Sequence, residues 1–440
     1  MAATAPDLLL AGADERDLTK LDEYRAIGGY GALARARELE PAALVQTLTD
    51  ATLRGRGGAG FPMGRKASLI DQRSPKPKYV VVNADESEPG AFKDREIMAR
   101  TPHRLLEGCL ITAHAIESKA VFIYIRGEYL TEYEILRGAL EEARDAGFLG
   151  DVDVIIHRGA GAYICGEESA LLESLEGKRG QPRPRPPFPP VTGLYDAPTQ
   201  INNVGTIALV PKIIELGVKE FTKIGVPSAP GTAVFSLSGN VVRPGNYELP
   251  LGIPLRTLIY DVGGGIPDGR RLKGVIPGGS SVPIMTPDQL DTPFDYDSIQ
   301  AAGSFFGSAA VIVVDDRCCM VQLALRATKF YMHESCGKCT PCREGTRWLV
   351  QLLTRIEAGD AVQSDLGLLE NVCFRMLGRS LCALGDFAVY PVSSYLSKFR
   401  AEFQQHVDEG ACPFGGESSL EGVEAPIDAH THFPTVEVPA

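Results

Sequence analysis

Three closely spaced cysteines are the strongest chemical feature of this sequence. Cys336, Cys339 and Cys342 follow the spacing C-x2-C-x2-C, with small or turn-forming residues between them. Three thiolates on such a tight turn can face one point, and Cys382, further along the chain, can supply a fourth sulfur. Four thiolates are the ligand set of a [4Fe–4S] cluster, whereas structural zinc sites usually pair two C-x2-4-C units or include histidine. The spacing therefore favours an iron–sulfur cluster over zinc, and over a disulfide knot because nothing indicates export.

The composition is that of an ordinary globular chain with more than one domain. The sequence has 440 residues, of which 44% are hydrophobic and 23% are charged, and its net charge is -12. This charge argues against a nucleic-acid-binding surface and against direct docking on an anionic membrane. No run approaches the ~18 apolar residues of a membrane-spanning helix, and the N-terminus lacks the basic region of a secretory signal. We therefore expect any membrane association to come through partner proteins.

The other cysteines give no metal signal of their own. The chain has 10 cysteines, and without an export signal we expect them to be reduced thiols or metal ligands. Those outside the group above show no ligand spacing, so most are expected to be small buried hydrophobic residues. They are Cys109, Cys165, Cys318, Cys319, Cys373 and Cys412.

A glycine-rich loop, Arg54–Pro62, is the first candidate ligand-binding segment. Gly55, Gly57 and Gly60 match G-x-G-x-x-G, but the dinucleotide-binding fingerprint needs a strand before it. Here a helix-like segment precedes the loop and the strand 79–83 follows it, so an ordinary Rossmann site is excluded. Such a loop still lets backbone N–H groups approach phosphate, which favours a phosphate or nucleotide loop over a flexible surface loop. Four basic residues lie in or near it: Arg54, Arg56, Arg65 and Lys66.

Two further loops follow predicted strands. Strand 79–83 runs into the polar segment 83–90, and strand 152–156 is followed by the glycine-rich segment 159–169, which opens a helix. Ligands of α/β sheets bind at the carboxyl ends of strands, so both segments are candidate ligand loops. The carboxylates of segment 83–90 repel phosphate and would face sugar hydroxyls or ring N–H groups. A solvated acidic turn and an ordinary strand-to-helix turn remain the respective alternatives.

Two later segments complete the candidate pocket. The proline-rich run 181–190 is stiff and extended, and as a wall it would hold Arg185 and Phe188 over a ligand. Segment 199–206 opens a helix with capping residues, whose backbone donors suit phosphate.

The order of predicted elements defines the fold class. Strands and helices alternate through the first half, which predicts an α/β doubly wound layer sandwich. A Pro/Gly linker at 225–231 is followed by a predicted hairpin and a strand at 310–314, which suit a small α+β domain. From 318 to 405 the pattern is helical, and the segment after 411 is polar and acidic.

Four motifs, taken together, resemble one known family. They are Arg54–Pro62, Asn83–Gly90, Gly161–Glu168 and Glu334–Arg343, in this order along the chain. In this combination they are similar to the NADH-binding, FMN-containing flavoprotein component (the F-type subunit) of respiratory complex I. The resemblance implies a Rossmann-like FMN-binding α/β layer sandwich, a small β-grasp-like α+β domain and a C-terminal helical bundle that holds a [4Fe–4S] cluster.

The resemblance also implies a division of the chain. Its five parts are a disordered N-terminus (1–17), N-terminal helices with the FMN/NADH-binding domain (18–228), a β-grasp-like, soluble-ligand-binding-like domain (229–316), the bundle with the [4Fe–4S] site (317–410) and an extended tail (411–440).

Residue roles are carried over by position from the same resemblance. The residues implied to contact FMN are Gly55, Arg56, Gly57, Lys66, Asn83, Asp85, Gly166, Asn202, Asn203 and Thr206. Those implied to surround nicotinamide, ribose and flavin ring are Glu88, Tyr163, Glu167 and Glu168. Phe61 and Phe188 are implied to stack on adenine, and Glu86 and Arg185 are further cofactor-binding candidates. The implied cluster ligands are Cys336, Cys339, Cys342 and Cys382. Leu69 and Arg185 stand where some relatives have an aromatic residue and Lys, which bears on NADH affinity.

The implied activity is that of an NADH dehydrogenase (NADH:quinone oxidoreductase). NADH would be oxidised by hydride transfer to FMN, and single electrons would pass to the cluster and on to partner subunits toward quinone. No acid or base is expected, and Glu88, Tyr163 and Glu168 would only position the reactants. The implied partners are a thioredoxin-like [2Fe–2S] subunit and a large multi-cluster iron–sulfur subunit, at the cytoplasmic face of the inner membrane.

Two alternatives remain at this point. The first is the NADH-handling diaphorase subunit of a soluble NAD-linked hydrogenase or formate dehydrogenase, which often carries extra ferredoxin-like or thioredoxin-like modules. The second is a non-enzymatic iron–sulfur sensor or scaffold, which needs no flavin loops.

Overall fold

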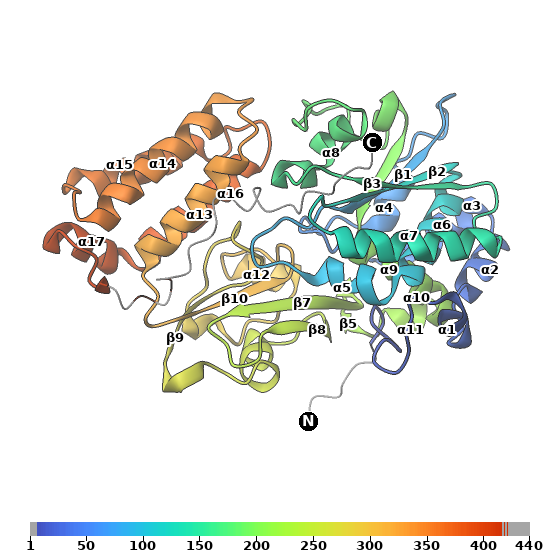
Figure 1. Cartoon of the computed structure of the whole chain (residues 1–440), viewed down its shortest axis with the longest axis horizontal. Helices are drawn as coiled ribbons and strands as arrows, with labels where there is room; N and C mark the ends of the chain where they lie inside the picture. Colours follow the sequence, from blue (N-terminus) through green and yellow to red (C-terminus); the bar gives the residue numbers. More distant parts are fainter. Residues whose placement is uncertain (1–6, 416–417, 419, 421–440) are drawn as a thin grey trace, which may run out of the picture.

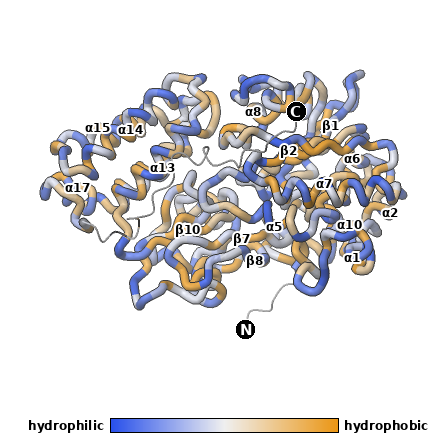
Figure 2. The backbone as a smooth tube through the Cα atoms, in the orientation of Figure 1, coloured by the Kyte–Doolittle hydropathy of each residue, from blue (hydrophilic) through white to orange (hydrophobic). Residues whose placement is uncertain are grey.

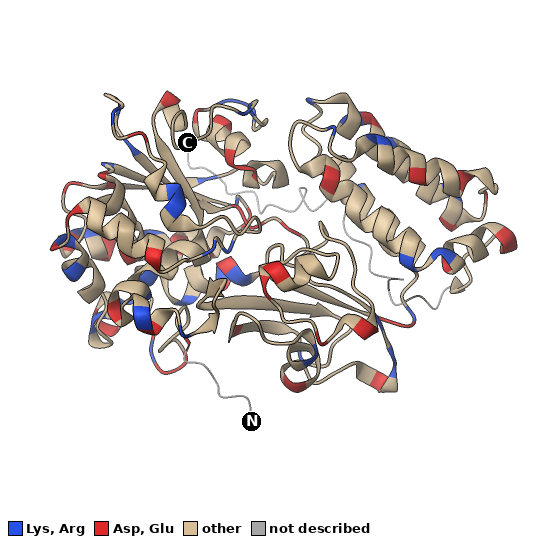
Figure 3. Cartoon of the chain, turned by 180° about the vertical axis from the view of Figure 1, so that it is seen from behind, with Lys and Arg blue, Asp and Glu red and all other residues tan. Residues whose placement is uncertain are grey.

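The computed structural model describes residues 7–415, 418 and 420 of the chain. Figure 1 shows an α/β part on one side, a helical bundle on the other and a smaller sheet-containing part below them. Figure 3 shows acidic and basic residues interspersed over all three parts. Within the described ranges, we find no helix that is both long and apolar enough to cross a membrane.

A parallel four-stranded sheet organises the α/β part. Its strand order is β3-β2-β1-β4, and every neighbouring pair is parallel. The strands are β1 (Tyr79–Ala84), β2 (Ala120–Ile125), β3 (Asp153–Arg158) and β4 (Thr199–Asn203). The helices of this part are α1 (Leu21–Ala26), α2 (Gly31–Arg37), α3 (Pro41–Asp50), α4 (Met63–Ser68), α5 (Lys93–Arg100), α6 (Pro102–Ile116), α7 (Leu130–Asp145), α8 (Glu168–Leu175), α9 (Val204–Ala208), α10 (Val210–Leu216) and α11 (Val218–Phe221).

Both faces of this sheet are covered, which explains the continuous apolar runs of its strands. Val80 and Val82 belong to the hydrophobic core under α6, whereas Val81 belongs to a second core that extends into the bundle. Successive strand residues point to opposite faces, so an uninterrupted apolar run is needed when neither face meets water. Figure 2 shows β1, β2 and the inner face of α6 as the most hydrophobic part of the tube.

The smaller part is built on a mixed sheet of order β8-β7-β10-β9. Its strands are β7 (Thr232–Gly239), β8 (Gly245–Pro250), β9 (Leu272–Ile276) and β10 (Ala310–Asp315), with the helix α12 (Tyr296–Ala301). The predicted hairpin is confirmed, because β7 and β8 pair antiparallel, and β10 joins β7 in parallel. A two-stranded ribbon of β5 (Gly225–Val226) and β6 (Ala229–Pro230) precedes it.

The C-terminal part is a helical bundle, as predicted. Its helices are α13 (Met320–Glu334), α14 (Thr340–Ala358), α15 (Ser364–Met376), α16 (Leu384–Lys398) and α17 (Arg400–Glu409). The cysteine turn joins α13 to α14, and α17 adds a fifth helix at the end of the bundle away from α8 (Figure 1).

The expectation of a disordered N-terminus is wrong for residues 7–17. Leu8 and Leu9 are buried, and the backbone N–H groups of Leu8, Leu9 and Leu10 donate to the carboxylate of Glu248 on β8. The apolar Leu8–Leu10 run thus attaches the α/β part to the small domain. Residues 1–6 lie outside the described residues, as does most of the expected tail 411–440, namely 416–417, 419 and 421–440.

Candidate functional site

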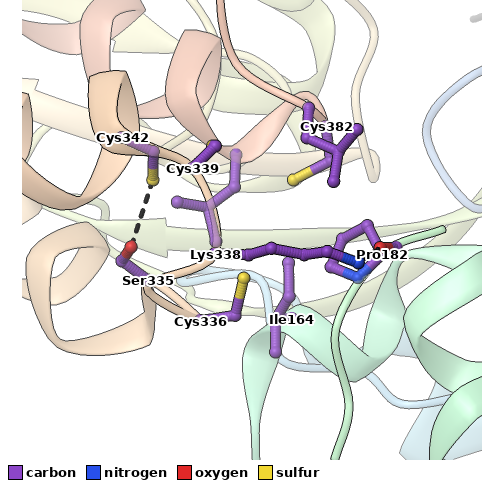
Figure 4. Close-up of a pocket in the computed structure, with 10 residues that line it drawn as sticks. Ile164, Pro182, Ser335, Cys336, Lys338, Cys339, Cys342 and Cys382 are labelled. Carbon is purple, nitrogen blue, oxygen red and sulfur yellow. Dashed lines mark hydrogen bonds between the residues drawn. The ribbon is translucent and has the colours of Figure 1, made fainter. Parts of the chain in front are cut away.

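The four predicted cluster ligands line one pocket. The turn between α13 and α14 carries Cys336 and Cys339, the first turn of α14 carries Cys342, and the segment before α16 carries Cys382. The pocket has a volume of about 260 Å³, counting space open to solvent. Figure 4 shows the sulfurs of Cys336 and Cys382 directed into the space between these two segments, and that of Cys342 beside the Ser335 hydroxyl, 3.2 Å away.

The spacing and burial of these sulfurs fit a cluster better than a single ion. Among the described residues, the one group of metal-ligand atoms that lie within 4.8 Å of one another is found elsewhere, so these cysteines stand further apart. Four sulfurs around one zinc ion would be only ~3.8 Å apart. Burial raises the pKa of Cys342 to about 11 and that of Cys382 to about 12, which favours neutral thiols. A strongly cationic centre is needed to hold such groups as thiolates.

The pocket also borders the α/β part. Ile164 and Pro182 line it beside the cysteines. Lys338 in the cysteine turn donates to the Pro182 carbonyl at 2.7 Å, and Gln181 donates to the Cys336 carbonyl at 3.0 Å. The proline-rich segment is therefore fastened to the cluster turn. Ile164 belongs to the second glycine-rich loop, so the cluster site also lies directly against that loop.

The first glycine-rich loop is held rigidly by Arg56. The backbone N–H of Arg56 donates to the Thr206 hydroxyl at 2.8 Å, and its buried guanidinium donates to the carbonyls of Arg54, Pro230 and Thr232. Because each of its three nitrogens donates to one of these carbonyls, the guanidinium positions the loop. A phosphate would instead meet backbone N–H groups of the loop.

Glycine is required in this loop by close packing. A Cβ at Gly57 would lie 2.9 Å from the Cβ of Asn203. Gly60 has φ +64°, and a Cβ there would lie 2.6 Å from the ring of Tyr296. The loop thus approaches the carboxyl end of β4 closely enough to form a cradle that side chains would fill.

The carboxyl ends of β1 and β4 bring together the predicted polar residues. Asn83 donates to the Gly166 carbonyl at 2.8 Å, and Asn202 accepts from Gln200 at 3.0 Å. Asn203 caps α9 by accepting from the Gly205 N–H, and its side chain donates to Asp94 at 2.6 Å. These side chains line the edge of the sheet where ligands of α/β folds bind.

Asp85 is the most informative residue at this edge. Both of its carboxylate oxygens are buried and have no hydrogen-bond partner in the structure. Burial raises the pKa of Asp85 to about 8, despite the nearby charge of Arg126. A buried polar group without a partner costs stability unless a ligand satisfies it. A ligand that presents an N–H group, as the pyrimidine ring of a flavin does, fits this site.

Glu86, a further predicted cofactor contact, is held by hydrogen bonds within the protein. Its oxygens accept from the backbone N–H groups of Asp94 and Arg95 and from the hydroxyl of Tyr129. The side chain is buried, and burial together with the charge of Asp94 raises its pKa to about 7. Glu86 therefore fixes the start of α5 through both of its carboxylate oxygens.

Glu88 and Tyr163 connect all three parts of the molecule. Glu88 accepts from the Tyr163 hydroxyl and from the Ser281 N–H, both at 2.8 Å, the latter in the small domain. The Tyr163 N–H donates to Glu334, which ends α13 just before the cysteine turn. The Tyr163 ring also packs edge-on against Phe330 of α13. These contacts link the acidic loop to the cluster turn.

The acidic pair of the second loop forms a charged wall. Glu167 caps α8 by accepting from the N–H groups of Ser169 and Ala170. Glu168 is paired with Arg185 at 2.9 Å and with Lys66 at 3.5 Å. The predicted residues Lys66, Glu168 and Arg185 are thus brought together, which fits recognition of hydroxyl groups more than of a second phosphate.

The predicted adenine-stacking residues lie on the surface. Phe61 is 40% exposed and Phe188 is 55% exposed, and Leu69 is also exposed. Arg65 lies over the Phe61 ring at 5.9 Å. Large exposed rings are available for stacking on a planar ligand.

Comparisons with known proteins agree with this arrangement. The family model described as the Nuo51 FMN-binding domain matches residues 48–212, and the NADH-ubiquinone oxidoreductase-F iron-sulfur binding region matches 322–406. The SLBB domain model matches 234–285 between them. The NADH-quinone oxidoreductase F 2 subunit of Rhizobium meliloti (strain 1021) is 51% identical over 416 residues, which cover 92% of this chain and 99% of the relative. The chain belongs to the family of NADH-quinone oxidoreductase F subunits.

Another member of this family is nearly as similar. The F subunit of the NADH-quinone oxidoreductase of Streptomyces coelicolor (strain ATCC BAA-471 / A3(2) / M145) is 50% identical over 422 residues, covering 93% of this chain and 94% of the relative.

Among solved structures, a chain in a crystal structure of NAD+-reducing [NiFe]-hydrogenase in the H2-reduced state has a TM-score of 0.80 and 35% identity. That match covers 94% of this chain and 69% of the hydrogenase chain.

Membership of this family confirms the predicted fold class and cofactors. The FMN-binding region carries the glycine-rich and acidic loops, and the iron–sulfur region carries all four cysteines of the pocket. Sequence patterns alone did not reveal the link from Glu88 to Ser281 or the role of Tyr129 as a partner of Glu86. Each of these contacts joins segments far apart in the sequence, which no local pattern signals.

Proposed function

We propose that this chain is the electron-input subunit of an NADH:quinone oxidoreductase. Membership of the family of F subunits supports NADH oxidation with FMN and a [4Fe–4S] cluster. One observation carries the more specific proposal: Ile164 lines the cysteine pocket, while Gly166, two residues later, borders Asp85. A single short loop therefore separates the flavin site from the cluster site. Electrons can pass between them without crossing a third domain.

The residues at the flavin site bind and orient the reactants. Bound FMN supplies the hydride acceptor and the cluster supplies one-electron transfer. The loop at Gly57 offers backbone donors to the phosphate, and Asp85 accepts an N–H group of the ring. Lys66, Glu168 and Arg185 form the wall that recognises ribose hydroxyls. No side chain in this set has to move a proton, so the site acts by orientation and exclusion of water.

The roles of individual residues remain part of this proposal. Gly55, Asn83, Gly166, Asn202, Asn203 and Thr206 shape the FMN site, mostly through backbone contacts and helix capping. Glu88, Tyr163 and Glu167 hold the loops that flank the nicotinamide, and Phe61 and Phe188 offer rings to adenine. Cys336, Cys339, Cys342 and Cys382 bind the cluster.

We also propose partners and a location. Family membership implies partner subunits of a complex, and we propose a thioredoxin-like [2Fe–2S] subunit and a large multi-cluster subunit, at the cytoplasmic face of the inner membrane. Exposed apolar side chains on the bundle support docking there, including Trp348, Phe374 and Leu377. The domain boundaries 18–228, 229–316 and 317–410 belong to the same proposal.

The second candidate is a diaphorase subunit of a soluble NAD-linked hydrogenase or formate dehydrogenase. The TM-score of 0.80 to a chain of an NAD+-reducing hydrogenase favours it. The sequence identity of 51% to an F subunit of an NADH-quinone oxidoreductase, against 35% to the hydrogenase chain, favours the first proposal.

The test is an anaerobic purification followed by two measurements. Released FMN is quantified, and NADH turnover is assayed with ferricyanide as an artificial acceptor. Stoichiometric FMN with NADH-specific turnover supports the proposal. Iron and sulfide without flavin, in a chain coexpressed with its neighbouring subunits, would contradict it. Copurification with a [NiFe] subunit would favour the second candidate.

A further inference from the structure

A second group of metal-ligand side chains lies in the helical bundle, away from the cluster pocket. Its members are Cys319, Glu357, His406 and Cys412, which we call the distal ligand group. One ligand atom from each residue lies within 4.8 Å of every other. They come from four segments: the residue before α13, the last turn of α14, α17 and the chain that follows α17. Neither the flavin nor the iron–sulfur cluster uses them.

The distances in this group are those of a tetrahedral zinc shell. The sulfurs of Cys319 and Cys412 are 3.8 Å apart, and the Cys319 sulfur is 3.4 Å from Nε2 of His406. The same sulfur is 3.6 Å from a Glu357 oxygen, which is 3.4 Å from Nε2 of His406. Zinc bonds of ~2.3 Å to sulfur and ~2.0–2.1 Å to nitrogen and oxygen give tetrahedral edges of ~3.8 Å (S–S), ~3.5 Å (S–N), ~3.6 Å (S–O) and ~3.4 Å (N–O).

The surroundings orient these atoms in the way that metal ligands require. Nδ1 of His406 lies 2.8 Å from the Glu402 carbonyl, which can only accept, so Nδ1 carries the proton and Nε2 presents its lone pair. The Gln322 N–H, in the first turn of α13, donates to the Cys319 sulfur at 3.4 Å. Burial nevertheless raises the pKa of the Cys319 thiol, so a bound cation is needed to hold it as a thiolate.

The backbone fixes the two more exposed members of the group. A Cβ at Gly359 would lie 2.0 Å from the Gly410 carbonyl oxygen, so the chain after α14 and the chain after α17 are in direct contact. Both glycines have positive φ, +78° and +62°, which lets each helix end sharply there. This contact between Gly359 and Gly410 places Glu357, at the end of α14, next to Cys412, which follows α17.

An ion pair between Lys273 and Glu402 lies next to the negatively charged ligand group. Two thiolates and one carboxylate around a divalent ion leave one negative charge. The Lys273 ammonium lies close by, 2.6 Å from the Cys318 carbonyl and 2.5 Å from the Glu402 carboxylate, and 4.8 Å from the ring of Phe414. This lysine belongs to β9 of the small domain, and its ion pair with Glu402 links the small domain to the first turn of α17 beside the site.

A simple ion pair explains less of this arrangement. Glu357 and His406 could form a buried pair without a metal, but that leaves two sulfurs meeting at the same point. His406 and Cys319 are both buried beside the Glu357 carboxylate. Because a thiol forms only weak hydrogen bonds, such bonds offset little of the free-energy cost of burying these polar groups.

We propose that the distal ligand group binds one zinc ion, which fastens the chain after α17 to α13 and α14. The two-sulfur, one-nitrogen, one-oxygen shell is complete, so the site is structural and has no open position for substrate. It lies at the opposite end of α13 from the cluster turn, a helix of ~22 Å at 1.5 Å per residue. Zinc has no redox chemistry, so this site takes no part in electron transfer.

The test uses the full-length flavoprotein purified in its complex under anaerobic conditions. Zinc and iron are measured by mass spectrometry, and zinc K-edge absorption reports the ligands. We expect about one zinc per chain, bound by two sulfur and two nitrogen or oxygen atoms. Cys412→Ser and, separately, Glu357→Gln should lower zinc to roughly a tenth of that or less while iron and FMN stay unchanged. Cys373→Ser, a buried cysteine of α15, is the matched control and should retain the zinc.

Several results would overturn the proposal. Zinc bound by four sulfurs would place it in the cluster pocket, as would zinc that persists in Cys412→Ser but disappears in Cys336→Ser. No zinc in the wild-type protein, even after exposure to zinc, would also overturn it. A native disulfide between Cys319 and Cys412, found by mass spectrometric mapping, would also overturn the proposal, because a covalent bond would then join these segments in place of zinc.

Discussion

The two ends of α13 carry sulfur ligands of two different kinds. At its C-terminal end, four cysteines stand widely spaced around a pocket of about 260 Å³ beside the α/β part. At its N-terminal end, two cysteines, a histidine and a glutamate have their ligand atoms within 4.8 Å of one another. The more widely spaced sulfurs at the C-terminal end suit a multi-iron cluster, and the closely spaced ligand atoms at the N-terminal end suit one ion. The spacing of ligand atoms thus separates an electron carrier from a structural fastening within one helical bundle.

The two ends also differ in their neighbours. The cysteine pocket contacts the loop that carries Tyr163 and Ile164, so it is coupled to the nucleotide site. The distal ligand group is instead built from the residue before α13, from α14, α17 and the chain after α17, all within the C-terminal part. Changes at one end should therefore leave the other intact, and the predictions below test this independence.

The largest effect is expected from Cys382→Ser. This variant should lose the electron paramagnetic resonance signal of the [4Fe–4S] cluster and its quinone-linked activity, because one of four thiolate ligands is gone. NADH turnover with ferricyanide should remain, since the flavin loops are untouched. Zinc content should also remain at the wild-type level. Loss of zinc together with the cluster would mean that the two ends of α13 are not independent.

Replacing Gly57 by leucine should remove the flavin and spare both metal sites. A Cβ at this position already lies 2.9 Å from Asn203, and a larger side chain would also fill the cradle. We expect FMN affinity to fall by about fivefold to more than a hundredfold, and FMN content with it, from an overpacking cost of ~1–3 kcal/mol. Fluorescence of released FMN measures this. Gly138→Leu is the control, because nothing lies within 4 Å of a Cβ there, on the exposed side of α7. Full flavin content in Gly57→Leu would reject the proposed phosphate loop.

A more selective change is Asp85→Asn, which removes the carboxyl that has no partner. FMN affinity should fall about tenfold, in line with ~1–3 kcal/mol for a lost hydrogen bond to a charged or buried group. Titration of the flavin-free protein with FMN measures this. Unchanged affinity would show that Asp85 does not face the flavin.

The same substitution should change the pH dependence of stability. The pKa of Asp85 is raised from 3.8 to about 8 in the folded state, so between these values the folded state binds more protons than the unfolded state. The contribution of Asp85 to flavin-free stability therefore falls as pH rises from about 4 to about 8. Asp85→Asn should remove this decrease, so its stability advantage over the wild type should grow with pH. Thermal unfolding of flavin-free protein at several pH values measures it, and an advantage that shrinks with rising pH would contradict the assignment.

The smallest effect is expected from Leu69→Phe. Leu69 is 52% exposed, and the resemblance stated above implies an aromatic residue at this position in some relatives, so we expect a ring there to stack on adenine. We expect the KM for NADH to fall about two- to tenfold, for ~0.5–1.5 kcal/mol of stacking, with kcat unchanged. Leu216→Phe, an exposed position on α10, is the control and should leave the KM unchanged. An unchanged KM in Leu69→Phe would place the adenine elsewhere.

The comparison of the two ends shows what the sequence could predict. Three of the four cluster ligands fall within seven consecutive residues, Cys336 to Cys342, so a local pattern revealed the site before any fold was known. The distal ligand group comes from four separate segments, and its spacing follows no local rule. For this reason Cys319 and Cys412 showed no ligand spacing in the sequence, although the structure brings them together.

The fold was predictable for similar reasons, with informative exceptions. The apolar runs of β1 and β2 and the helices α6 and α7 follow from periodicity and burial on both faces. The order of residues 7–17 was not predictable, because it depends on Glu248, far along the chain, which accepts three backbone N–H groups. The hydrogen bonds of Glu86 to the start of α5 were also not predictable, because a buried helix-capping carboxylate and a ligand-binding one look the same in sequence.

The most direct test is whether NADH reduces the cluster through the flavin site. Intact complex is purified anaerobically, mixed with NADH and frozen for electron paramagnetic resonance spectroscopy. For wild-type protein that holds about one FMN and about four iron atoms per chain, we expect NADH to produce the signal of a reduced [4Fe–4S] cluster. In the Gly57→Leu variant, we expect this signal after reduction with dithionite but not after addition of NADH. A flavin-loaded wild-type protein whose cluster is reduced by dithionite but not by NADH would contradict the account.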